Sequence, residues 1–177
     1  TLTYYKGLEE AKLIENDVEA FGGDLTIKYL DVTNDKSIKN ILEIYDHIYY
    51  FPTPKIKKNI SNSYDQNLHN RYLLYYVEGF RNITKLINMK KQSKIMYPST
   101  IFIDKKSKGL SEYIDAKIKG ELFCSQFASK KSLIIYTPRI PAVLTDQNIS
   151  LIPKKYEDIV KVANNLVVMM STPKLEK

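Results

Sequence analysis

Residues 94–121, KIMYPSTIFIDKKSKGLSEYIDAKIKGE, decide the fold class of this chain. A short apolar run predicts a strand at 95–98, and apolar residues at helical spacing predict a helix over 112–129. Two hydroxyl residues, Ser99 and Thr100, follow the strand directly. A strand followed by a helix is half of the unit from which α/β proteins with parallel sheets are built, so this stretch predicts such a sheet.

The same alternation of strand and helix runs through the rest of the chain. Further strands are expected at 2–5, 25–30, 47–51 and 133–137, and further helices at 8–20, 35–44, 67–90 and 156–170. Polar loops are expected at 52–66 and 104–111, the first of them long enough to be a mobile loop near a site. The order of elements predicts an α/β fold with right-handed crossovers, in a single domain over 1–177.

Composition and charge limit the classes of function that this chain is expected to have. The chain has 177 residues, a net charge of +7 and one cysteine, Cys124, which we expect to be a packed core thiol. No apolar run is long enough to span a membrane, and the single cysteine and the N-terminal sequence predict a cytoplasmic protein. The lysines are scattered in pairs and triplets without a nucleic-acid-binding motif, and no residues have metal-ligand spacing. His47 lies in a strand-like run and is expected to be structural.

Three stretches resemble short-chain dehydrogenase/reductases. Residues 18–38, VEAFGGDLTIKYLDVTNDKSI, resemble the second helix, third strand and DVT turn of that family. Residues 94–121 resemble its strand with a catalytic Ser or Thr, followed by Tyr-x-x-x-Lys. Residues 138–146, PRIPAVLTD, are similar to the segment that folds over the nicotinamide. The resemblance implies a Rossmann-like doubly wound parallel sheet and an NAD(P)H-dependent reductase.

The resemblance also implies a catalytic group. Tyr113 would be the acid–base residue of a ketone reduction, and Lys117, one helical turn later, would lower its pKa. Thr100 or Ser99 would hold the carbonyl oxygen. Thr100 lies 13 residues before Tyr113 and Ser99 lies 14 before, and both alternatives stay open. Either hydroxyl could instead cap the end of its strand.

Cofactor-binding residues follow from the same resemblance. Lys117 would bind the nicotinamide ribose, Asp31 with Val32 would contact the adenine, and Thr145 belongs to the segment over the nicotinamide. Asp31 could also cap the helix that follows it. Lys6 stands at the tip of the expected second strand of the family, where an acid would favour NAD, so NADP is expected, with NAD as the alternative.

The sequence departs from the family in its glycines. None of its six glycines forms a G-x-G-x-x-G motif, and the chain looks as if it begins at the family's second strand, without the first strand and the glycine-rich loop. We therefore expect a fragment of a longer polypeptide, a chain completed by a partner, or a relic that binds no cofactor. A relay asparagine of the family would fall near Tyr76.

The segment YYFPTPKI, 49–56, and the others quoted above resemble ketoreductases associated with polyketide and nonribosomal peptide synthases. The substrate would be a small ketone or a β-keto acyl thioester on an acyl carrier protein, which Lys105, Lys106 and Lys108 would attract. A homodimer, or neighbouring domains of a larger synthase, would be further partners. The alternatives are a truncated non-catalytic reductase-like docking domain and a sugar-nucleotide epimerase or dehydratase relative.

Overall fold

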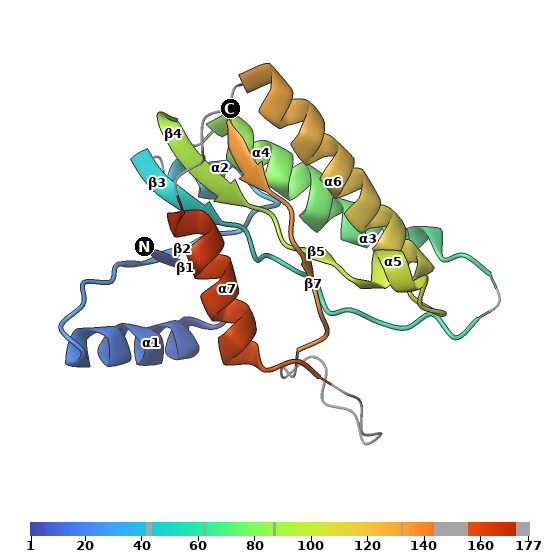
Figure 1. Cartoon of the computed structure of the whole chain (residues 1–177), viewed down its shortest axis with the longest axis horizontal. Coiled ribbons are helices and arrows are strands. Elements are labelled where there is room, and N and C mark those ends of the chain that lie inside the picture. The colour runs from blue at the N-terminus through green and yellow to red at the C-terminus, as the bar shows by residue number, and fades with distance from the viewer. Residues whose placement is uncertain (42–43, 62, 87, 132, 144–155, 173–177) are drawn as a thin grey trace. The chain divides into compact units, whose positions relative to one another are not determined.

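The computed structural model describes residues 1–41, 44–61, 63–86, 88–131, 133–143 and 156–172 (Figure 1). The chain divides into two compact units, one formed by Thr1–Ile44 with Glu78–Asn88 and the other by Tyr45–Val77 with Met89–Lys177. All of the predicted catalytic residues lie in the second unit.

The first unit is built around a pair of parallel strands. It contains β1 (Leu2–Tyr4), α1 (Leu8–Ala20), β2 (Ile27–Tyr29), α2 (Asp35–Lys39) and α4 (Phe80–Leu86). Helix α1 has the predicted bounds and is followed by Gly22 at φ +75°, a left-handed conformation that glycine adopts without strain. The predicted helix 35–44 is wrong at its end, because α2 stops at Lys39 and the next strand already begins at Ile44.

The second unit contains the longer β–α succession. Its elements are β3 (Ile44–Tyr49), α3 (Gln66–Leu73), β4 (Asn88–Met96), β5 (Ser99–Thr100), α5 (Phe102–Lys105), α6 (Ser111–Lys131), β6 (Ile134–Tyr136), β7 (Arg139–Ile140) and α7 (Ile159–Ser171). Strands β3, β4 and β6 form one sheet in that order, and β4 runs parallel to β6. A short parallel pair, β5 and β7, continues from the ends of β4 and β6. The predicted α/β fold with parallel pairing is confirmed.

Helices cover the β4–β6 sheet from two sides (Figure 1). On one side, Met96 packs in a buried cluster with Leu166 and Met170 of α7. On the other side α6 lies against Tyr97, whose hydroxyl is so close to Gly120 that any Cβ there would collide with it. Glycine is therefore required on α6 for this strand and helix to approach each other.

The predicted helix 67–90 is wrong at its C-terminal end. Helix α3 begins after the Asp65 cap and continues through a π-helical segment, η1 (Leu74–Gly79), into α4, which ends at Leu86. Strand β4 then begins at Asn88. The run NMKKQS has no alternating apolar pattern, so pairing with neighbouring strands, rather than local sequence, makes it a strand.

Smaller differences concern the strands expected at 95–98 and 47–51 and the loop expected at 104–111. The expected strand 95–98 is the end of β4, separated from β5 by Tyr97 and Pro98, and the short helix α5 occupies the start of the expected loop 104–111. The strand expected at 47–51 begins earlier, at Ile44. None of the described helices is long and apolar enough to cross a membrane.

Candidate active site

Helix α6 places Tyr113 and Lys117 on one buried face. Their side chains are one turn apart, and the two residues are only 7% and 6% exposed. Strand β5 places Ser99 and Thr100 nearby, each 4% exposed. The structure therefore brings together all four residues that the sequence singled out for catalysis.

The two neighbouring hydroxyls have different partners. The Thr100 hydroxyl hydrogen-bonds to that of Tyr113. The Ser99 hydroxyl instead donates to Oε1 of Glu121 at 2.5 Å. Because successive residues of a strand point to opposite sides, one hydroxyl faces the tyrosine and the other faces the carboxylate.

Aromatic rings surround Tyr113 and keep its environment apolar. The rings of Tyr72 and Tyr76 each meet the Tyr113 ring edge-on, with centroids 5.7 Å apart. Tyr50 stacks on Tyr97 at 6.1 Å, and both of these residues are buried. The sequence pattern predicted Tyr72 and Tyr76 as part of the apolar face of a helix, with Tyr76 also near the position of the family's relay asparagine, and it gave no signal that Tyr50 or Tyr97 belongs to the site.

Among the described residues, no carboxylate lies within hydrogen-bonding distance of the Lys117 ammonium group. Its Nζ donates to the carbonyl of Pro98 at 2.7 Å and lies 3.8 Å from the ring centroid of Tyr76 and 5.1 Å from that of Tyr97. Burial lowers the pKa of Lys117 to about 7, although the neighbouring Cys124 and Glu121 act in the opposite direction. The carbonyl dipole and the faces of the rings are what remains to stabilise its charge.

The expected lowering of the Tyr113 pKa is not observed. Burial raises the pKa of Tyr113 to about 12, and its hydrogen bond with Thr100 only partly opposes this. The Lys117 ammonium lies 6.0 Å from the centroid of the Tyr113 ring. Desolvation of the phenolate therefore outweighs the hydrogen bond with Thr100, so Tyr113 is protonated at neutral pH.

Tyr76, near which the resemblance puts the family's relay asparagine, has its ring over the ammonium of Lys117. It belongs to η1, where the backbone departs from the ordinary helical ladder. The carbonyl of Tyr76 accepts a hydrogen bond from the Tyr97 hydroxyl at 3.0 Å, and that of Tyr75 accepts one from Tyr50 at 2.6 Å. The Tyr76 hydroxyl pairs with that of Thr53 at 2.5 Å. The π-helical segment is thus held by the same tyrosines that line the site.

A charged network lies beside Ser99. Glu121, one turn after Lys117, accepts hydrogen bonds from Arg139 at 3.0 and 2.8 Å, and Arg139 also pairs with Asp104 at 2.5 Å. The hydrogen bond from Arg139 lowers the pKa of Glu121 despite its partial burial. This network was not predicted from the sequence, although the four-residue spacing of Tyr113, Lys117 and Glu121 was a signal for it.

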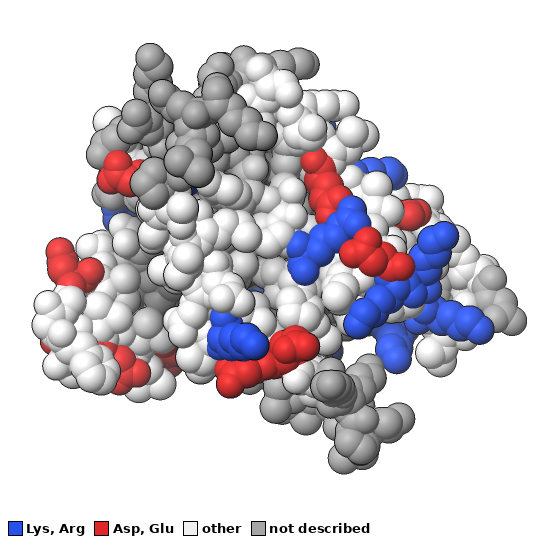
Figure 2. Space-filling model, viewed as in Figure 1, with Lys and Arg blue, Asp and Glu red and all other residues white. Residues whose placement is uncertain are grey.

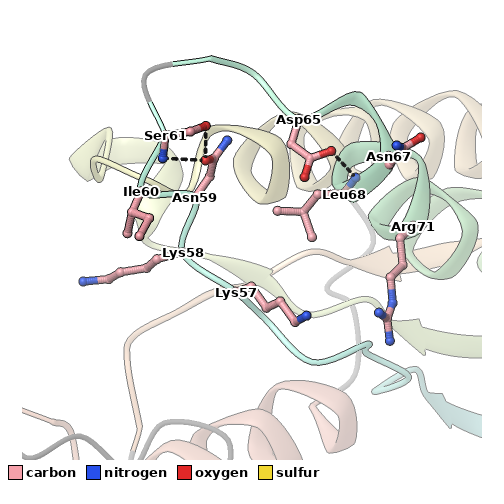
Figure 3. Close-up of a pocket in the computed structure, with 9 residues that line it drawn as sticks. All are labelled: Lys57, Lys58, Asn59, Ile60, Ser61, Asp65, Asn67, Leu68 and Arg71. Atoms are coloured by element: carbon pink, nitrogen blue, oxygen red, sulfur yellow. Dashed lines mark hydrogen bonds between the residues drawn. The ribbon is translucent and has the colours of Figure 1, made fainter.

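The loop between β3 and α3 is anchored to the helices. The buried carboxylate of Glu112 accepts hydrogen bonds from Nδ2 of Asn59 at 2.5 Å and from the backbone N–H of Asp65 at 2.8 Å. Burial alone would raise the pKa of Glu112, but these two donors hold it below its usual value. The N–H of Lys57 donates to the Tyr72 hydroxyl at 2.9 Å. A cavity of about 500 Å³ lies beside this loop (Figure 3).

Three of the expected cofactor residues lie in the first unit. Asp31 Oδ1 accepts hydrogen bonds from the N–H and the hydroxyl of Thr33 at 2.9 and 2.7 Å. Asn34, not Asp31, caps α2. Val32 is buried and Lys6 is exposed. Lys117 lies in the second unit, and Thr145 lies outside the described residues.

Other candidate groups have simpler surroundings. Cys124 is buried, as predicted, and burial raises its pKa to about 12, so the thiol is protonated at neutral pH. His47 lies on β3, with its ring 6.5 Å from that of Tyr49. In the described part of the chain, no group of three or more His, Cys, Asp or Glu side chains could hold a metal ion.

The sequence matches no protein-family model and no curated protein, whereas many solved structures match the fold. A short-chain oxidoreductase from Thermus thermophilus superposes with a TM-score of 0.73 at 16% identity, over 99% of this chain and 87% of that one. An alcohol dehydrogenase from the archaeon Thermococcus sibiricus, complexed with 5-hydroxy-NADP, gives 0.81 at 14%, over 98% and 80%. A short-chain dehydrogenase from Burkholderia cenocepacia, in complex with NADP, gives 0.71 at 12%, over 95% and 78%. At these identities the likeness establishes an α/β Rossmann-like fold.

Proposed function

We propose that this chain is a reductase domain that uses NAD(P)H to reduce a ketone. The observation that supports it best is the buried cluster of Tyr113, Thr100 and Lys117, which lies where a parallel strand passes into the following helix. Oxidoreductases share the fold. Two hydroxyls of this cluster, those of Tyr113 and Thr100, would bind a carbonyl oxygen, and Lys117 is the cation beside them.

In this mechanism the cofactor supplies the hydride, and the chain's residues position the carbonyl and provide a proton. The hydroxyls of Thr100 and Tyr113 would donate hydrogen bonds to the carbonyl oxygen, and Tyr113 would transfer its proton as negative charge develops there. The raised pKa of Tyr113 keeps the phenol protonated at neutral pH, so the proton that the reduction requires is present. Lys117, with a pKa of about 7, is the neighbouring group that can supply charge or a proton.

NADP is the proposed cofactor. Structures of the same fold are solved with NADP or NADPH. The ammonium of Lys117 and the hydroxyls beside it suit the ribose and nicotinamide end, and Lys6 after β1 suits a 2′-phosphate. The pyrophosphate end is less well matched, because this sequence contains no glycine-rich phosphate-binding motif.

The test is a calorimetric titration of the chain with NADPH and NADH, followed by an assay of Tyr113→Phe. We expect saturable binding that is tighter for NADPH, and a loss of turnover of at least about 100-fold in the variant, since it keeps the ring but has no proton to transfer. Circular dichroism would check that the variant is folded. Full activity of Tyr113→Phe would refute the assignment of the proton donor.

The finer substrate proposal is a β-keto acyl thioester on an acyl carrier protein of polyketide synthesis. The exposed lysines Lys105, Lys106 and Lys108 would attract an acidic carrier. Figure 2 shows that, on the face it draws, several Lys and Arg side chains gather in one area, with Asp and Glu side chains beside them. If the proposal is right, replacing all three lysines by glutamate should lower kcat/KM for a carrier-bound substrate and leave a free thioester unaffected.

We also propose that two copies pair through the helices α3 and α6. These helices pack against each other, and Leu74, Ile118 and Leu122 remain exposed along the helical segments 66–79 and 111–131. Analytical ultracentrifugation should then give twice the mass of the chain, and Leu122→Glu should give a monomer.

A non-catalytic reductase-like docking domain is the second candidate. Tyr113, Thr100 and Lys117 are almost completely buried, and the glycine-rich motif is absent from this sequence. The same titration separates the two functions, because a docking domain would bind neither NADPH nor NADH at millimolar concentration.

A further inference from the structure

The loop that follows β3 forms one wall of a basic cavity, and α3 forms the other. The cavity has a volume of about 500 Å³. It is lined by three cationic residues, Lys57, Lys58 and Arg71, by the carboxylate of Asp65, and by neutral side chains that include Ile60 and Leu68 (Figure 3). A volume in this range is typical of small-molecule sites, of about 300 to 1,000 Å³, and exceeds what an inorganic ion needs.

The cavity keeps a net positive charge, because three cationic side chains and one carboxylate line it. Asp65 caps α3, and its Oδ1 accepts a hydrogen bond from the N–H of Leu68 at 3.0 Å. Among the residues that the structure describes, no carboxylate forms an ion pair with Lys57, Lys58 or Arg71. In the view of Figure 3, the side chain of Lys57 extends toward that of Arg71, whereas Lys58 extends the other way. A guanidinium beside an ammonium is a suitable arrangement for a carboxylate or phosphate group.

Residues of the cavity wall are hydrogen-bonded to two residues next to Tyr113. One is Tyr72, whose ring contacts that of Tyr113, and the other is Glu112, which precedes Tyr113 in the chain. The backbone of Lys57 is hydrogen-bonded to the Tyr72 hydroxyl, and the Tyr72 ring meets the ring of Tyr113 at 5.7 Å. Asn59 donates both to Glu112, the residue before Tyr113, and, through its backbone N–H, to the carbonyl of Gly109 at 2.8 Å. The backbone of the cavity wall at Lys57 is therefore connected to Tyr113 through one aromatic side chain, that of Tyr72.

We propose that this cavity binds the anionic group, a carboxylate or a phosphate, of an organic substrate whose ketone reaches Tyr113. Arg71 and Lys57 bind the anion, and Ile60 and Leu68 contact the apolar part of the molecule. The proposal that the anion is part of the substrate rests on the proposed reductase function. The proposal that the cavity binds an anion does not rest on it.

The first experiment measures the anion site without any turnover. The chain is titrated by calorimetry with inorganic pyrophosphate and, separately, with malonate, which distinguishes a phosphate from a carboxylate preference. We expect saturable binding of at least one of them, weakened about tenfold or more in Arg71→Gln and in Lys57→Gln. Lys85→Gln, which removes the same charge from the exposed end of α4, is the matched control and should bind as the wild type does.

Two results of that titration would overturn the anion site. One is the absence of saturable binding to the wild-type chain. The other is an equal loss of affinity in Lys85→Gln and Arg71→Gln, which would mean that net charge rather than the cavity binds the anion. Circular dichroism of each variant ensures that a misfolded protein is not mistaken for a loss of the site.

The second experiment tests whether the anion belongs to the substrate. NADPH consumption is followed with a β-keto acid and with its methyl ester, in which a methyl group replaces the negative charge of the carboxylate. We expect Arg71→Gln to raise KM for the acid about tenfold and to leave KM for the ester and both kcat values unchanged. If both substrates turn over and Arg71→Gln affects neither, the substrate assignment is overturned while the reductase function stands.

The outcomes separate the two hypotheses. Anion binding that depends on Arg71, without turnover of either ketone and without NADPH binding, would refute the reductase function but support the site. If the turnover of the ester rises when free pyrophosphate is added, the anion is a separate molecule that acts on Tyr113 through Tyr72. That result would overturn the substrate assignment.

Discussion

Two cations beside helix α6 are stabilised in opposite ways. Lys117 is buried among tyrosine rings, and its only hydrogen-bond acceptor in the described part of the chain is the carbonyl of Pro98. Arg139 lies at the surface and binds two carboxylates, Glu121 and Asp104. Burial lowers the pKa of Lys117, whereas the hydrogen bond to Glu121 raises the pKa of Arg139.

The difference between Lys117 and Arg139 shows which kind of charged group suits a reactive centre and which kind stabilises the structure around it. A charge that is fully paired, as in Arg139, holds neighbouring segments in place but has little tendency to change its protonation state. A charge stabilised only by a carbonyl dipole and aromatic faces, as in Lys117, can lose its proton near neutral pH. The following substitutions probe this contrast, beginning with the largest expected effect.

The variant Lys117→Met should change how stability depends on pH. The unfolded chain keeps the proton of this lysine up to its ordinary pKa of 10.5, while the folded chain releases it near 7. Between these values the unfolded state binds more protons, so the wild type should gain stability as pH rises, by up to about 1.4 kcal/mol per pH unit.

Urea unfolding at several pH values between about 7 and 9.5 measures this slope. Lys117→Met should lack it and should be the more stable protein at pH 7. The methionine leaves the Pro98 carbonyl without its donor, but that cost does not depend on pH, so the slope is the informative quantity. Parallel pH profiles for the two proteins would contradict a lowered pKa.

Thr100→Val and Ser99→Ala should affect turnover unequally. Thr100 hydrogen-bonds to Tyr113, so its loss should reduce kcat about 100-fold, as for other groups that stabilise a developing oxyanion. Ser99 is bonded to Glu121 instead, and Ser99→Ala should keep most of the activity. Steady-state kinetics of both variants would decide, and the reverse order of effects would exchange the roles of the two hydroxyls.

Tyr76→Leu should shift the pH dependence of activity. The Tyr76 ring lies 3.8 Å from the Lys117 ammonium, and losing such a contact costs the charged form about 1 kcal/mol, so the pKa of Lys117 should fall further. Activity that requires the ammonium should then decline at a lower pH than in the wild type. Tyr76→Phe keeps the ring and removes only the hydroxyl, so an equal shift in that variant would exclude a role for the ring.

Arg139→Gln should have the smallest effect. Its ion pairs are exposed, and such pairs contribute little to stability, so we expect Tm to fall by less than about 2 °C. The difference between the proteins should shrink further in about 0.5 M salt, as judged by thermal unfolding. A large loss of stability at high salt would mean that Arg139 acts through packing rather than charge.

The local sequence pattern was sufficient to predict those helices and strands whose structure depends mainly on their own residues. Helix α1 has its predicted bounds, because its apolar spacing and the glycines after it are both local signals. The helix that contains Tyr113 and Lys117 was also predicted, together with their common face. The end of the helix predicted at 67–90 was wrong, because the strand character of the run NMKKQS depends on its neighbours in the sheet.

The sequence alone established the α/β class, the helix that carries Tyr113 and Lys117, and the two hydroxyls before it. These follow from periodicity and spacing, which are properties of a short segment. The tertiary structure decided which hydroxyl meets Tyr113, placed the Tyr76 ring over Lys117, and raised the pKa of Tyr113 where a lower one was expected. These depend on burial and on contacts between segments far apart in the chain, and a pKa depends on how many water molecules the fold removes, which spacing along a sequence does not reveal.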